Sequence, residues 1–118
     1  MTIDWIEYKG KKILRTVYTG HTHQENVEIL EQQGKIERKD ANLLILSDYT
    51  GTHASQEYME KVKAYGKEFR SGPTNVKNAV IGIEGLKKVL FDSYLRFTGD
   101  KYTRVFSSEE EAKEWLVK

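Results

Sequence analysis

Apolar and polar residues alternate with a period of two near the start of the chain, which is the pattern of half-buried β-strands. The alternation covers Ile3 to Tyr8 and again Ile13 to Tyr18, and the turn between them contains Gly10. Two alternating runs joined by a short glycine-containing turn predict an antiparallel β-hairpin.

Beyond the hairpin, segments with helical spacing alternate with short apolar runs of strand length. Further strands are predicted at Leu43 to Leu46, Val76 to Ile83 and Tyr102 to Phe106. Helices are predicted from Thr22 to about Gly34, from about Ser55 to Ser71, from Leu86 to about Thr98, and from Ser108 through Leu116. The run from Leu43 to Leu46 is apolar without interruption, so we expect this strand to be central and covered on both faces.

Capping boxes are expected at the starts of the first and last helices, where a hydroxyl and a carboxylate three residues apart satisfy free backbone amides. The pairs are Thr22 with Glu25 and Ser108 with Glu111. Alternation divides the strand at 76–83 into two faces, with Val80 on one and Ala79, Ile81 and Ile83 on the other.

A hairpin followed by alternating strands and helices predicts one α/β domain over residues 1–118, with a five-stranded, mostly parallel sheet and four helices. Short right-handed crossovers require the later strands to run parallel to Ile13 to Tyr18. Ligands collect at the carboxyl ends of parallel strands, so three loops are expected to converge at one end of the molecule. These loops span 19–24, 48–56 and 82–85.

Composition excludes several classes of protein. The chain has 118 residues and no cysteine, which excludes a thiol nucleophile, a disulfide framework, an iron–sulfur cluster and a cysteine zinc site. With 19 basic and 18 acidic residues, bulk charge does not favour nucleic-acid binding. The sequence contains no apolar run of membrane-spanning length and no signal-peptide pattern at its start, so we expect a cytoplasmic protein without membrane insertion.

Several chemically active residues are predicted near the ligand-collecting end of the sheet. They are His21, His23, Asp48, His53, Gly82, Glu84 and Gly85. Histidines and carboxylates are metal ligands, but a His-x-His pair on a loop has no fixed geometry, so we expect neither a metal nor a cofactor. The strand-to-helix turn at 82–85 exposes amides, but Glu84 would repel a phosphate, which favours a tight turn.

Ser55, His53 and Asp48 could in principle supply the Ser/His/Asp triad of a hydrolase. Nothing in the sequence provides the strained Gly-x-Ser-x-Gly turn or an oxyanion hole, so we expect no catalytic site. Without such a site, Ser55 is expected to cap the second helix.

The third predicted helix is apolar on two sides. Leu86, Leu90 and Phe97 form one stripe, whereas Phe91 and Leu95 fall on the opposite side. We expect Phe91, Tyr94 and Leu95 to form an association patch, with a homodimer as its simplest use.

Several residue strings resemble the STAS-fold family of small bacterial proteins, which includes the anti-sigma-factor antagonists. The strings are Leu46 to Gly51, Ala79 to Leu86, Arg96 to Gly99, Phe106 to Ala112, and Trp115-Leu116. The resemblance implies a partner-binding or regulatory module, with a serine at the start of the second helix that a partner kinase phosphorylates. Ser55 occupies that place, with Thr52 and Thr50 as alternatives, although it follows Ala54 instead of the family's aspartate.

These observations leave three functional classes open. The first is a non-catalytic regulatory or scaffolding module that binds an unidentified protein partner. The second is a small-ligand or lipid-binding module related to apolar-pocket carriers, and the third is an enzyme. Within the first class, the resemblance adds a phospho-switch antagonist of an anti-sigma kinase that acts through Ser55.

Overall fold

The computed structural model describes residues 3–18, 23–40, 42–51, 60, 61, 64, 75–83 and 102–118. In this part of the chain, five strands form one sheet and two helices pack against it. The strands are β1 (Ile3–Tyr8), β2 (Lys11–Val17), β3 (Leu44–Asp48), β4 (Lys77–Ile81) and β5 (Thr103–Val105). The helices are α1 (His23–Lys39) and α4 (Glu109–Leu116).

The five strands follow one another across the sheet in chain order. β1 pairs with β2 in antiparallel orientation, and every later pair is parallel. The predicted hairpin and the predicted parallel strands are therefore confirmed. The hairpin closes through Lys9 and Gly10, with φ angles of 49° and 80°, and positive φ at both central residues matches the right-handed twist of the paired strands.

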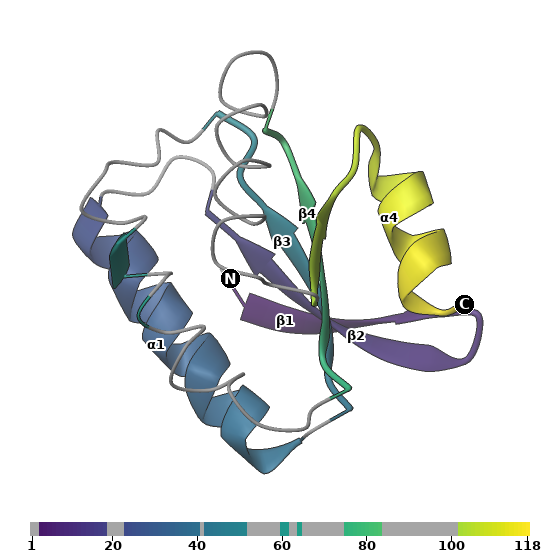
Figure 1. Ribbon diagram of the computed structural model, residues 1–118, viewed down its shortest axis with the longest axis horizontal. Helices are drawn as coiled ribbons and strands as arrows, with labels where there is room; N and C mark the ends of the chain where they lie inside the picture. The colour runs from purple at the N-terminus through teal and green to yellow at the C-terminus, as the bar shows by residue number, and fades with distance from the viewer. Residues whose placement is uncertain are drawn as a thin grey trace.

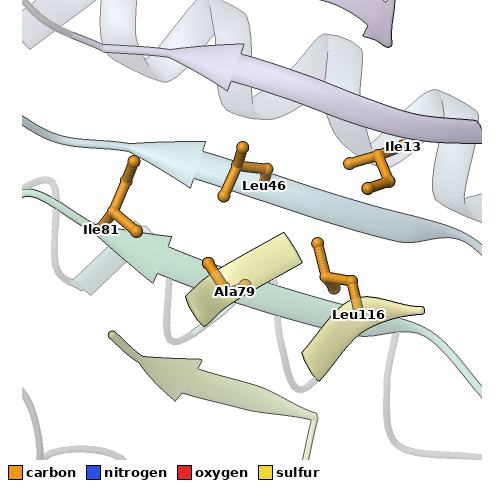
Figure 2. Packing of buried hydrophobic residues seen from close by; sticks show 6 residues of the cluster. Ile13, Leu46, Ala79, Ile81 and Leu116 are labelled. Carbon is orange, nitrogen blue, oxygen red and sulfur yellow. The ribbon is translucent and has the colours of Figure 1, made fainter. Parts of the chain in front are cut away.

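The sheet lies between the two described helices (Figure 1). On one face, Ile29 and Leu30 of α1 pack with three buried side chains from the sheet, Tyr18, Tyr49 and Val80. On the other face, Ala112 and Leu116 of α4 pack on side chains from β2, β3 and β4. Figure 2 shows this second cluster, which contains Ile13, Leu46, Ala79, Ile81 and Leu116.

The start of α4 confirms the predicted cap. Ser108 has an extended backbone and its hydroxyl oxygen accepts a hydrogen bond from the backbone nitrogen of Glu111 at 3.2 Å. The first turn also contains Glu109 and Glu110, and these negative charges interact favourably with the helix dipole. The predicted Thr22 cap of the first helix lies outside the described residues.

The described part of the chain contains two helices where the sequence predicts four. Within the predicted second helix, the three described residues Glu60, Lys61 and Ala64 are helical. The predicted third helix, at 86–98, lies outside the described residues. None of the helices in the described part is both long enough and apolar enough to span a membrane.

The first helix extends further than the sequence predicts. α1 continues past Gly34 to Lys39, and Ile36 in its last part packs against a buried cluster that includes Leu14 and Ile45. Glycine inside a helix costs about 1 kcal/mol relative to alanine. Packing beyond Gly34 therefore outweighs the local preference to stop.

The predicted position of Ile83 is wrong. Ala79 and Ile81 belong to the cluster under α4, whereas Ile83 packs against the cluster under α1. The cause is Gly82, whose φ of 88° ends the strand alternation and turns the following side chain to the other face.

Replacing Gly82 by alanine is expected to destabilise the fold more than the same change at Gly10. Both glycines have φ near +80°, where an L-residue costs about 1–2 kcal/mol. At Gly82, the added Cβ would also overlap the backbone nitrogen of Thr50, whereas nothing lies within 4 Å of a Cβ at Gly10. Urea unfolding of the two variants measures the difference, and equal losses of stability would contradict the close approach of these two turns.

Candidate functional site

Two of the predicted ligand-end residues, Asp48 and Gly82, lie next to each other at the carboxyl ends of β3 and β4. The Oδ1 atom of Asp48 accepts hydrogen bonds from the backbone nitrogen of Thr50 at 2.9 Å and from its hydroxyl at 2.6 Å. The backbone nitrogen of Tyr49 donates to the carbonyl of Ile81 at 2.9 Å, so the ladder between the strands continues into the turn. Asp48 therefore stabilises this turn.

The second carboxylate oxygen of Asp48 faces a basic side chain. Arg15 Nη2 lies 3.8 Å from Asp48 Oδ2, and Arg15 Nε lies 3.5 Å from Glu109 Oε1 at the start of α4. The Arg15 side chain is 32% exposed, so each ion pair is partly screened by solvent. Arg15 thus links β2 to β3 and to α4, and Asp48 has a structural partner at each of its oxygens.

Two further residues of the predicted sites, His23 and Thr50, lie among the described residues. His23 begins α1, and Thr50 is an exposed turn residue whose hydroxyl is bonded to Asp48. The other predicted ligand-end, phosphorylation and association residues lie outside the described residues, namely His21, Thr52, His53, Ser55, Glu84, Gly85, Phe91, Tyr94 and Leu95. Within the described ranges, no group of three His, Asp or Glu side chains is arranged to hold a metal ion.

The buried side of α1 carries polar residues along its centre. Asn26, Gln33 and Glu37 are 3%, 2% and 7% exposed. They are seven and four residues apart, a spacing that places them on one side of a helix. The helical spacing rule, applied to the polar residues of the sequence, would have shown this stripe.

Part of this stripe forms a chain of hydrogen bonds. The hydroxyl of Tyr18, which is fully buried, donates to Gln33 Oε1 at 3.3 Å, and Gln33 Nε2 donates to Glu37 Oε1 at 3.2 Å. The ring of Tyr18 stacks on that of Tyr49, with centroids 4.4 Å apart and planes within 2°. The chain of bonds ties the end of β2 to the middle of α1.

The sheet under α1 is polar as well. Thr16 and Ser47 are direct partners in the register of β2 and β3, and they are 0% and 1% exposed. Ser47 Oγ donates to Asn78 Oδ1 on β4 at 2.8 Å. Thr16 Oγ1 and Asn26 Oδ1 are buried and have no hydrogen-bond partner among the described residues. Leaving a buried polar atom without any partner would cost about 1–3 kcal/mol.

A second polar cluster ties the hairpin to α4 on the opposite face of the sheet. The Tyr8 hydroxyl lies 2.6 Å from Glu114 Oε1 and 3.0 Å from Glu110 Oε1, within hydrogen-bond distance of both acceptors, and Lys9 Nζ lies 2.5 Å from Glu114 Oε1. The hydrogen bond to Glu114 raises the pKa of Tyr8 well above its ordinary value. The hydrogen bond from Lys9, together with the one from Tyr8, lowers the pKa of Glu114.

Trp5 is the one exposed large apolar side chain in the described part of the chain, with 52% of its surface accessible. It lies in the middle of β1, one of the two edge strands of the described sheet. Both faces of β1 contain apolar residues, so alternation alone did not show which of them the helices cover.

Comparison with known proteins finds no matching family model, no matching curated protein and no matching solved structure.

Removing the Asp48 carboxylate is expected to loosen the turn after β3. Asp48→Ala loses both hydrogen bonds to Thr50 and the ion pair with Arg15, with an expected loss of about 1–3 kcal/mol of unfolding free energy. Asp48→Asn keeps an oxygen acceptor and should lose less. Urea unfolding measures both, and an Asn variant as unstable as the Ala variant would show that charge, and not the turn, is the main contribution.

Stability is expected to depend on pH through Glu114. Because its pKa is lowered in the folded state, its contribution is present above its ordinary pKa of 4.5 and disappears as the pH falls through the lowered value. Glu114→Gln should therefore be less stable than wild type at neutral pH, and the difference should shrink as the pH falls below the ordinary pKa of 4.5. Unfolding curves across this range provide the measurement, with Glu28→Gln on α1 as a charge-matched control. A difference that does not change with pH would contradict the assignment.

Proposed function

We propose that the chain is a non-catalytic module that binds an extended segment of a protein partner along the outer edge of β1. Trp5 would be its apolar anchor. The observation that carries this proposal is the exposure of Trp5, 52%, on an edge strand of the described sheet. A regulatory or scaffolding role in the cytoplasm, expected from the sequence, belongs to the same proposal.

The position of β1 supports binding by strand addition. β1 is six residues long and pairs on one side with β2, while its other side is the end of the strand order in the described sheet. The outer edge of such a strand presents backbone donors and acceptors that an extended peptide can pair with. Backbone pairing supplies affinity, and side chains along the strand supply selectivity.

The chemistry of Trp5 supports an anchoring role. Tryptophan is among the residues most enriched at positions that dominate binding energy in protein interfaces. Its register partner on β2 is Leu14, which is fully buried. Trp5 thus extends the apolar surface of the sheet outward, to where a partner side chain can cover it.

The charges of β1 favour a basic partner segment over a second copy of this chain. The strand contains Asp4 and Glu7 and no cationic side chain. On the inner side, Asp4 and Glu7 are the register partners of Arg15 and Lys12, so the neighbouring strand places basic residues opposite both acidic ones. Pairing β1 with β1 of a second copy would add acidic residues to an acidic strand, so self-association through this edge is the less favourable use of it.

Asp48, the described member of the Ser55, His53 and Asp48 set that a hydrolase would use, is committed to structural bonds, which supports a non-catalytic role. Asp48 is bonded to Thr50 and faces Arg15. The polar layer under α1 also does not suit an acyl chain, so lipid binding is not proposed.

A pair of synthetic peptides tests this function. One peptide alternates valine with lysine over about the length of β1, and the other alternates valine with glutamate. We expect the lysine peptide to bind, to change the fluorescence of Trp5 and to protect β1 amides from hydrogen exchange. Trp5→Ala should weaken the affinity about tenfold or more, since large apolar anchors commonly contribute over 1 kcal/mol to binding.

The matched control is Glu28→Ala, which changes an exposed residue of α1 and should leave peptide binding unchanged. Binding of neither peptide, or binding without protection of β1, would contradict the proposal. Equal binding of both peptides would support binding by strand addition but would contradict the preference for a basic partner. Sedimentation of the free protein tests the second-copy alternative.

A further inference from the structure

The layer between α1 and the sheet contains more polar groups than its hydrogen bonds use, and we propose that it binds ordered water. The anchoring atoms are Thr16 Oγ1 on β2 and Asn26 Oδ1 on α1. This inference rests on the buried polar residues under α1 and is independent of the partner proposed for β1.

Both oxygen atoms need a hydrogen-bond partner. Thr16 is 0% exposed and Asn26 is 3% exposed, so bulk solvent does not reach them. The great majority of buried polar atoms in folded proteins are hydrogen-bonded to protein or to ordered water. Two such atoms in one layer therefore indicate molecules held inside it.

The layer between α1 and the sheet contains several polar groups that can form hydrogen bonds with water. A buried water typically makes two to four hydrogen bonds to polar groups. On the sheet side, Thr16 lies opposite Ser47, whose hydroxyl is already joined to Asn78. On the helix side, Asn26 shares its face of α1 with the polar residues Gln33 and Glu37.

A molecule bound to these two oxygen atoms must be small and neutral. Apolar clusters flank the polar groups, with Ile29 and Leu30 on the helix and Leu14 and Ile45 on the sheet. The unpartnered oxygens carry no charge and include an amide acceptor, which needs a hydrogen-bond donor. Water meets these requirements, and about one buried water per 27 residues is usual in globular proteins.

Magnetic relaxation dispersion of water nuclei on the full chain tests the proposal, because it detects water molecules that remain inside a protein longer than the protein takes to tumble. We expect wild type to show such a signal. Thr16→Val and Asn26→Leu keep the approximate size of the side chain and remove its polar atoms. Each variant should lower the dispersion amplitude by the contribution of one bound water molecule. Thr50→Val is the control, since its hydroxyl is exposed and already bonded to Asp48.

Loss of amplitude in either variant, with no loss in Thr50→Val, supports the hydrated layer. Absence of a wild-type signal, or an unchanged amplitude in both variants, overturns it. Circular dichroism verifies folding of each variant. If Thr16→Val does not fold, the wild-type measurement and the Asn26→Leu variant decide the outcome. Thr16→Ser then serves as a further control, because it retains the hydroxyl and should keep the wild-type amplitude.

Discussion

The fold depends on β3, because its side chains enter both buried layers of the molecule. Leu46 belongs to the cluster under α4, while Ile45 and Tyr49 belong to clusters on the face that α1 covers. β3 also pairs in parallel with β2 on one side and with β4 on the other. A parallel strand in this position is buried on both faces, and the neighbouring strands and both described helices are positioned relative to it.

The two faces of the sheet are held by different kinds of interaction. Under α4, the contact is apolar, and Ala112 and Leu116 are 0% and 1% exposed. Under α1, the centre of the buried helix side is polar, and Tyr18 and Gln33 form part of a hydrogen-bonded chain. Apolar packing tolerates small shifts, whereas buried hydrogen bonds require defined partners. The α1 layer is therefore the more demanding part of this fold.

The turn of the hairpin is bonded to α4, whereas the outer side of β1 is an edge of the described sheet. At its turn, Tyr8 and Lys9 bind Glu114, which joins the N-terminal hairpin to the C-terminal helix. In the middle of β1, Trp5 is exposed. An edge strand fixed at its turn presents its outer side in a constant orientation, which is the property on which the proposed binding of an extended partner rests.

The sequence by itself determined the hairpin, the parallel strands and the Ser108 cap, because periodicity and capping act over a few neighbouring residues. It did not determine the extent of α1, the face of Ile83 or the exposure of Trp5. Each of these depends on contacts between distant segments: packing of Ile36, the close approach of Gly82 to Thr50, and the reach of the helices over β1. The polar layer under α1 was likewise decided by tertiary structure, since only the pairing of β2 with β3 places Thr16 beside Ser47.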